Sequence, residues 1–214
     1  MKKGFFVLGL FLPLTPNSII TMISRVSVFC ASSHKIDQKY FDVAEHLARV
    51  LVENNITTIY GGGSVGLMGK LADTVLEAGG KIVGIIPKFM MEVEWGHPKV
   101  DQLIEVADMH ERKKKLVEDI DAVVILPGGS GTLEEAMEVI TLKRLGKFTK
   151  PIIFVNTGGF YDNLFRLFDK MIDEKFMREE HRNMWTSINQ PENLINAIQN
   201  APVWDENAIN IAAV

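Results

Sequence analysis

Short apolar runs alternate with amphipathic stretches along most of the chain, and this alternation predicts the fold. The apolar runs cover residues 26–30, 57–60, 81–86, 122–126 and 151–155, with a shorter candidate at 103–106. Runs of this length that are rich in β-branched residues are typical of buried parallel strands. Helices are predicted between them over residues 38–53, over a stretch that ends at Ala78, and over 109–118, 136–145, 161–174 and 191–200. The sequence therefore predicts a Rossmann-like, doubly wound parallel sheet in a single α/β domain, with 151–155 as its last core strand.

The two ends of the chain stand outside this alternation. Residues 1–24 begin with Lys2 and Lys3 and continue as an apolar run, which is the layout of a signal peptide. No small-residue cleavage site follows, however, and the apolar run is shorter than the ~18 residues of a membrane span. We favour a translation start at Met22 over a secretory or anchoring segment. The domain is then expected over residues 25–200, and residues 201–214 as an extended or disordered tail.

The loop after the run at 122–126 carries the strongest functional signal. It contains Pro127, Gly128, Gly129, Ser130, Gly131, Thr132, Glu134 and Glu135. Three glycines in four positions leave backbone N–H groups open toward an anion at a helix N-terminus, which Thr132 can cap, and this favours phosphate. Two carboxylates in the first helical turn suit the helix dipole, and a purely structural role is the alternative. A carboxylate beside a phosphate-binding loop would be repelled by the ligand, however, so one of them is expected to have a chemical task.

A second glycine loop follows the strand at 57–60. It runs from Gly61 through Gly62, Gly63 and Ser64 to Gly69 and resembles dinucleotide-binding loops. No acidic residue about 20 residues later completes that fingerprint, and the loop lacks the Gly-Lys-Ser/Thr ending of a P-loop. Together with Ser33 in the loop after the first strand, two glycine loops at one sheet edge indicate a nucleoside monophosphate. Tight strand-to-helix turns without a ligand are the alternative.

Composition and charge exclude several other functions. The formal net charge of −4 and pI near 5.8 argue against a nucleic-acid partner, which needs a basic face. The single cysteine, Cys30, excludes a disulfide within the chain, and no Cys/His cluster has zinc spacing. These features indicate a reducing compartment such as the cytoplasm, no metal, and Cys30 as a small buried apolar residue.

A basic run over residues 110–115 opens the helix predicted at 109–118. Basic residues in the first turns of a helix oppose its dipole, which is unfavourable unless an anion lies nearby. Arg112 could hold a phosphate through two hydrogen bonds, or it could hold a carboxylate that performs the chemistry. A solvated helix face is the alternative.

Three motifs, at 61–69, 109–113 and 127–135, occur in an order and spacing that resemble the LOG (Lonely Guy) family of cytokinin-activating phosphoribohydrolases. Many members of that family carry the older description of possible lysine decarboxylase. The resemblance covers residues 25 to about 197. It implies a homodimer that hydrolyses the N-glycosidic bond of a nucleoside 5′-monophosphate, AMP included, to free base and ribose 5-phosphate. No cofactor is implied.

The resemblance also implies roles for individual residues. Arg112 and Glu135 match the catalytic pair of the family. Positions that match substrate contacts are Glu94, Lys113, Gly129, Gly131, Thr132, Glu134 and Thr141, and we add Gly128, Ser130, Gly62, Gly63 and Ser33 from the three loops. Glu94 belongs to an irregular flap at 88–100 and is expected to close over the substrate. Ser130 replaces the tyrosine of plant members.

Other functions and the choice of base stay open at this point. A lysine decarboxylase would need a pyridoxal phosphate lysine, and no lysine follows a strand in a setting that would lower its pKa. A nucleotide-binding or carrier module would keep the glycine loops but would not need Arg112 and Glu135 together. A membrane-tethered sensor rests only on the apolar run near the N-terminus. Met90, Met91 and Trp95 could line a pocket for an apolar substituent of the base or simply fill the core.

Overall fold

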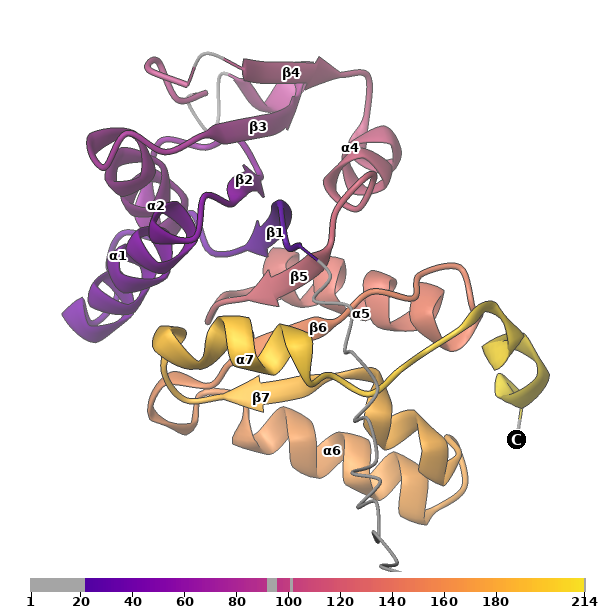
Figure 1. Cartoon of the computed structure of the whole chain (residues 1–214). Helices are drawn as coiled ribbons and strands as arrows, with labels where there is room; N and C mark the ends of the chain where they lie inside the picture. The colour runs from indigo at the N-terminus through magenta and orange to yellow at the C-terminus, as the bar shows by residue number, and fades with distance from the viewer. Residues whose placement is uncertain (1–21, 92–95, 101, 214) are drawn as a thin grey trace, which may run out of the picture.

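Seven parallel strands form one sheet in the computed structural model, which describes residues 22–91, 96–100 and 102–213 (Figure 1). The strand order is β4-β3-β2-β1-β5-β6-β7. The strands are β1 (Arg25–Phe29), β2 (Thr57–Tyr60), β3 (Ile82–Pro87), β4 (Gln102–Val106), β5 (Ala122–Ile125), β6 (Ile152–Val155) and β7 (Thr186–Ile188). Every neighbouring pair in this order is parallel. The predicted doubly wound α/β fold is thus confirmed.

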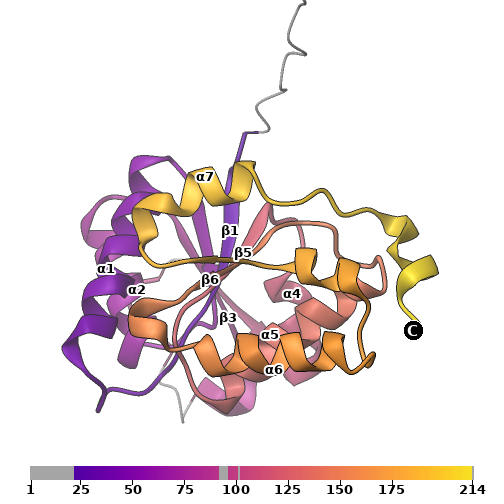
Figure 2. The same cartoon turned by 90° about the horizontal axis from the view of Figure 1, so that it is seen from below.

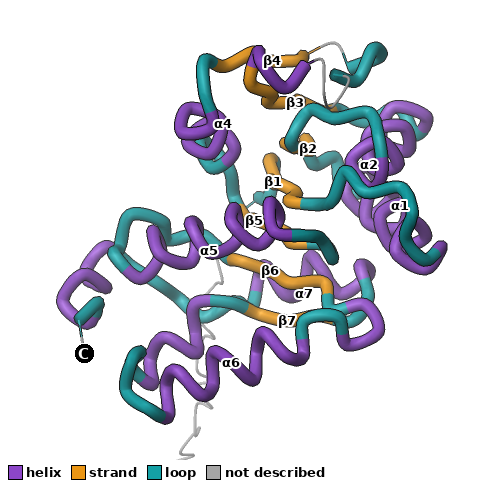
Figure 3. The backbone as a smooth tube through the Cα atoms, turned by 180° about the vertical axis from the view of Figure 1, so that it is seen from behind, coloured by secondary structure: helices purple, strands orange, loops and turns teal. Residues whose placement is uncertain are grey.

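Helices cover both faces of the sheet (Figures 1 and 3). The helices are α1 (Gln38–Glu53), α2 (Gly66–Glu77), α4 (Met109–Leu116), α5 (Ser130–Arg144), α6 (Asp162–Asp173) and α7 (Leu194–Gln199). One buried cluster joins α1, α2 and α7 to one face, and a second joins α4, α5 and α6 to the other. The central strands are therefore buried on both sides, which explains why they are continuous apolar runs.

The strand order reverses between β1 and β5. From β1 the chain builds outward through β2 and β3 to β4, and it then returns to place β5 on the other side of β1. The register pairs Phe29 at the end of β1 with Ile125 at the end of β5. Loops that leave these two strand ends diverge to opposite faces, so the gap between them is the place where such sheets bind ligands.

The C-terminal part differs from the sequence prediction in two ways. The run at 151–155 is not the last strand, because β7 adds a parallel edge strand beside β6. Residues 201–214 were expected to be extended or disordered, but 206–211 form a 3-10 helix, η5 (Glu206–Ile211), and Trp204 Nε1 donates a hydrogen bond of 2.6 Å to the carbonyl oxygen of Lys143. Figure 2 shows this segment running back past the end of the sheet. Neither feature has a long apolar pattern, so both depend on tertiary contacts.

None of the helices in the described ranges is long and apolar enough to cross a membrane. The predicted N-terminal extension lies almost entirely outside the described residues, which begin at Met22. Short 3-10 helices complete the structure: η1 (Lys88–Met90), η2 (Thr157–Gly159), η3 (Glu179–Met184) and η4 (Pro191–Asn193). The helix predicted over 191–200 is therefore a 3-10 turn followed by α7.

Candidate active site

A cleft of about 240 Å³ lies where the strand order reverses, at the carboxyl ends of β1 and β5. Its lining residues are Val28, Cys30, Ala31, Ser32, Ser33, Gly61, Met68, Arg112, Gly129, Ser130, Gly131, Thr132 and Glu135. They come from the loops after β1, β2 and β5 and from α4. The predicted convergence of three Gly or Ser loops at one sheet edge is therefore observed, with most of the lining being polar.

The N-terminus of α5 forms one wall of this cleft. The helix begins at Ser130 with Gly129 at the N-cap, and no side chain caps it there. The prediction that Thr132 caps the helix is wrong, because Thr132 is the third helical residue and is buried. The first N–H groups of a helix have no acceptor within the helix, so this terminus presents donors and positive potential to the cleft.

The three glycines of this loop have different reasons to be glycine. A Cβ atom on Gly128 would lie 2.2 Å from Oγ1 of Thr132, so Gly128 is required for packing. A Cβ atom on Gly129 or Gly131 would meet no atom of the described residues within 4 Å. Packing therefore does not explain Gly129 and Gly131, which line the cleft and leave the space above the helix terminus open.

The two carboxylates of the loop lie further along the helix than predicted. Because α5 begins at Ser130, Glu134 and Glu135 belong to its second turn and not to its first. Their environments differ: the side chain of Glu134 is 50% exposed, whereas that of Glu135 is 10% exposed. Glu135 borders the cleft, and Glu134 points to the surface. Only Glu135 is placed to act on a molecule in the cleft.

Arg112 holds Glu135 from the opposite wall. Its Nη1 lies 3.0 Å from Oε1 of Glu135, and both side chains are largely buried. Its Nε donates to the carbonyl oxygen of Ile85 at 3.2 Å and its Nη2 to that of Gly61 at 3.3 Å. The guanidinium is thus held by the residue after β2 and by a residue within β3, and this fixes the orientation of the carboxylate that it pairs with.

The lysines of the basic run do not oppose the dipole of α4, contrary to the prediction. α4 has only eight residues, so Lys113, Lys114 and Lys115 lie in its last turn, where they suit the helix dipole. Asp108 caps the helix by accepting a hydrogen bond of 2.8 Å from the amide of Glu111. The position of Arg112 is explained by its buried acceptors and not by an unfavourable dipole.

Lys113, predicted to contact substrate, bridges α4 and α5. Its Nζ lies 2.5 Å from Oε1 of Glu134 and also pairs with Glu138. The hydrogen bond with Glu134, followed by that with Glu138, raises the pKa of Lys113. Lys113 and Glu134 are absent from the cleft lining, so they connect the two helices beside the Arg112–Glu135 pair.

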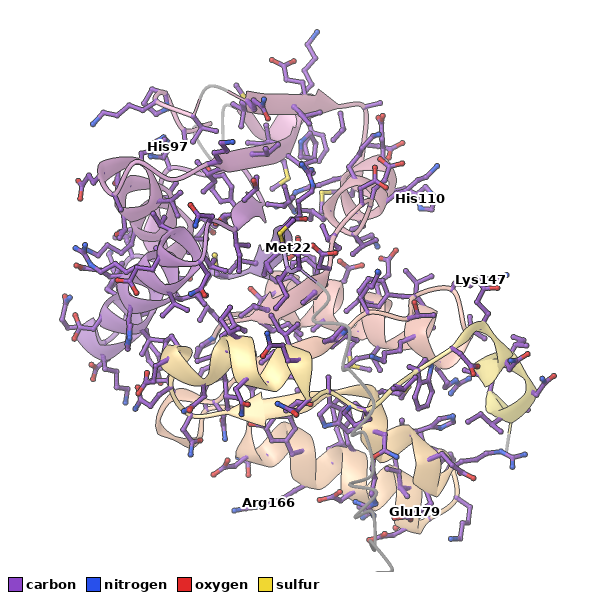
Figure 4. The ribbon with its side chains drawn as sticks, viewed as in Figure 1. Met22, His97, His110, Lys147, Arg166 and Glu179 are labelled. Atoms are coloured by element: carbon purple, nitrogen blue, oxygen red, sulfur yellow. The ribbon has the colours of Figure 1, made fainter. Side chains whose placement is uncertain are left out.

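The glycine loop after β2 contributes less than predicted. The carbonyl oxygen of Gly62, which has φ +82°, accepts a hydrogen bond of 3.1 Å from the amide of His97, and Gly63 pairs with Gly96. His97, labelled in Figure 4, is buried, and its Nε2 lies 3.2 Å from Oδ1 of Asp73. Neither Gly62 nor Gly63 lines the cleft; Gly61 does. The loop therefore joins neighbouring segments of the protein.

N–H groups at the start of α2 are also hydrogen-bonded within the protein. The amides of Leu67 and Met68 donate to the carbonyl oxygen of Ala31 at 2.9 and 3.2 Å. Two N–H groups at this helix terminus are therefore bound within the protein, whereas Gly129 and the first residues of α5 line the cleft.

Two more predicted contacts lie away from the cleft or outside the described residues. Thr141 is exposed on α5 and its hydroxyl donates to the carbonyl oxygen of Met137 at 2.8 Å, so it is not a cleft residue. Glu94, like Trp95, lies outside the described residues. Sequence reasoning missed six lining residues, which are Val28, Cys30, Ala31, Ser32, Gly61 and Met68. The position directly after a predicted strand is the signal that could have indicated Ala31, Ser32 and Gly61.

A second, apolar cavity of about 190 Å³ lies between α4 and α5. Its walls include Phe29, Leu116, Val117, Val139 and Leu142, and its polar lining includes His110, Lys113, Lys114, Glu135 and Glu138. Figure 4 shows His110 projecting from α4 toward the surface. Glu135 borders both spaces, so the buried carboxylate stands between a polar cleft and an apolar one.

The fold and the cleft define a doubly wound α/β protein with a buried Arg–Glu pair at its ligand edge. The family described as "Possible lysine decarboxylase" matches residues 68–198. The chain belongs to this family, the LOG family.

Named relatives and solved structures resemble most of the chain. Cytokinin riboside 5′-monophosphate phosphoribohydrolase LOG5 of Arabidopsis thaliana is 41% identical over 82% of this chain and 77% of its own length. LOG2 of the same plant, which has the same enzyme name, is 42% identical over 82% of both chains. The X-ray structure of TM1055 has a TM-score of 0.65 at 26% identity, covering 83% of this chain and 99% of that one. The molybdenum cofactor binding protein from Rippkaea orientalis has a TM-score of 0.63 at 21% identity over 83% of this chain and 96% of its own, a likeness of fold alone.

Proposed function

We propose that the protein hydrolyses the N-glycosidic bond of nucleoside 5′-monophosphates and releases the free base and ribose 5-phosphate. The observation that carries the proposal is the pair of Arg112 and Glu135, 3.0 Å apart and largely buried, at a cleft whose other wall is the uncapped N-terminus of α5. The names of the curated relatives support the same reaction.

The geometry suggests how a nucleotide would lie. Its 5′-phosphate would accept hydrogen bonds from the N–H groups at the start of α5, where Gly129 and Gly131 leave room and Ser33 faces them from the loop after β1. Glu135 lies five residues after Ser130, about 7 Å further along the helix axis. A phosphate at the helix terminus would therefore bring the ribose, and not the phosphate, beside this carboxylate.

The reaction requires stabilisation of positive charge on the sugar. As the bond between C1′ and the base nitrogen breaks, its electron pair leaves with the base, and the ribose ring gains oxocarbenium character. The carboxylate of Glu135 would stabilise that charge and orient the water whose oxygen bonds to C1′, while a proton from the water ends on the departing base. Arg112, whose Nη1 lies 3.0 Å from Oε1 of Glu135, would hold the carboxylate aimed at the ring.

The substrate, the oligomeric state and the cellular location can be proposed as well. The relatives' names suggest cytokinin nucleotides, and we include AMP. We expect a homodimer, which the family resemblance suggests, and a cytoplasmic location. A lysine decarboxylase is not supported: Lys143, whose pKa burial lowers to about 8, donates to the carbonyl oxygen of Lys150 at the far end of α5 from the cleft.

The test is release of free base from AMP and from isopentenyladenosine monophosphate, followed by chromatography. The full chain is compared with Glu135→Gln, Arg112→Lys and the control Glu174→Gln, whose side chain is exposed near the end of α6. We expect base release by the parent and the control, and nearly complete loss in the other two variants while they remain folded. A parent that binds AMP without releasing adenine would replace the proposal with a nucleotide-binding module. Light scattering after gel filtration tests the dimer, and cell fractionation tests the location.

A further inference from the structure

The guanidinium of Arg112 is held by backbone carbonyl groups of residues that are far away in the sequence. Nε donates to the carbonyl oxygen of Ile85, 27 residues earlier, and Nη2 to that of Gly61, 51 residues earlier. Arg112 is 6% exposed, so water does not replace these acceptors. The guanidinium is planar, so once Nε and Nη2 are held by these two carbonyl groups the direction of Nη1 toward Glu135 is fixed as well.

Position 61 requires glycine because neighbouring side chains leave no room for a Cβ atom, and not because of its backbone conformation. It is absent from the glycines with positive φ, so its backbone conformation is open to any residue, in contrast to Gly62. A Cβ atom on Gly61 would lie 2.3 Å from Nη2 of Arg112 and 2.9 Å from the sulfur of Met68. Both neighbours are buried, so a methyl group there would displace the guanidinium.

We infer that Gly61 is a positioning residue for catalysis: its missing side chain makes the space in which Arg112 is held against Glu135. The inference rests on the proposed function, because it assigns Gly61 a task in that reaction. An added methyl group would meet Arg112 and Met68 and would not enter the space above α5. It should therefore impair the chemical step more than the binding of the 5′-phosphate.

The experiment is a double-mutant cycle with Gly61→Ala and Arg112→Lys. Lysine ends near the position of the guanidinium carbon and has no atom at the place of Nη2, so it removes the clash at residue 112 and leaves only the contact with the sulfur of Met68. In the parent background, Gly61→Ala should lower kcat for base release from AMP about 100-fold, the size expected for a misplacement of about 1 Å, and change KM less than about threefold. In the Arg112→Lys background kcat is already nearly lost, so the coupling between the two positions is measured there by unfolding.

Urea unfolding of the same four proteins provides a readout that does not depend on activity. Gly61→Ala should lower the unfolding midpoint in the parent background and lower it clearly less in the Arg112→Lys background. An equal loss of midpoint in both backgrounds, or an unchanged kcat for Gly61→Ala in the parent background, would show that Gly61 only packs the loop and would overturn the inference. If the parent releases no base, the proposed function fails, and the catalytic part of the inference fails with it. The unfolding cycle then still decides whether Gly61 seats Arg112.

Discussion

Two glycines of the loop before α5 should respond to the same substitution in opposite ways. In Gly131→Ala the new methyl group meets no atom of the described residues within 4 Å, and Gly131 is the second residue of a helix. Glycine within a helix costs roughly 0.5–1 kcal/mol relative to alanine, so we expect Gly131→Ala to raise the free energy of unfolding by about 0.5 kcal/mol at this terminal position.

The same methyl group should weaken nucleotide binding. Gly131 lines the cleft in which the 5′-phosphate is proposed to meet the N–H groups of α5, and the methyl group would reduce the room there. One lost hydrogen bond to a charged group costs about 1.5–3 kcal/mol, which corresponds to roughly 10- to 150-fold in the Kd for AMP. Gly131→Ala is therefore expected to be more stable than the parent and weaker in binding.

Gly128→Ala is the matched comparison. Its methyl group would lie 2.2 Å from Oγ1 and 2.5 Å from Cβ of Thr132, which is buried and has a short side chain with little freedom to move. Overpacking of this kind costs about 1–3 kcal/mol, so the variant should be less stable than the parent. Urea unfolding and titration calorimetry with AMP measure both quantities. Equal AMP affinity in Gly131→Ala and the parent, or equal stability in Gly128→Ala and the parent, would refute this account of the loop.

Three further substitutions test the scaffold around the site. Burial lowers the pKa of Lys143 to about 8, so between pH 8 and 10 the unfolded chain binds more protons than the folded one and stability should rise with pH. The parent should gain about 2 kcal/mol relative to Lys143→Met over that range, and parallel pH profiles in urea unfolding would contradict it. Asp108→Ala removes the N-cap of α4 and should cost about 1 kcal/mol in the same assay; an unchanged midpoint would show that the cap does not stabilise. Tyr161→Phe leaves the carbonyl oxygen of Leu126 without its 2.7 Å hydrogen bond beneath the loop before α5, and should cost about 1–3 kcal/mol by thermal or urea unfolding, whereas no loss would mean that water replaces the hydroxyl.

The alternation of apolar runs and amphipathic stretches was enough to predict the parallel sheet up to β6 and the sheet edge at which the site lies. Strands buried on both faces must be continuous apolar runs, and helices that cover them must be amphipathic, so both leave a local signature. β7 leaves no such signature because it has only three residues at the sheet edge and pairs with β6. The C-terminal segment is likewise held by Trp204 against a carbonyl group of α5, a contact that no local pattern encodes.

Some features of the candidate site could be predicted from local sequence, and others depend on tertiary contacts. The motif before α5 and the candidates Arg112 and Glu135 could be chosen from residue types, spacing and family resemblance, because those features are local. The folded structure was needed to see that Arg112 is held by the carbonyl oxygens of Gly61, after β2, and of Ile85, in β3. It was also needed to see that Gly61, and not Gly62 or Gly63, lines the cleft. These hydrogen bonds join residues that are tens of positions apart in the sequence, and their acceptors are buried backbone carbonyl groups. Every residue has such a group, so the sequence does not show which ones Arg112 will reach.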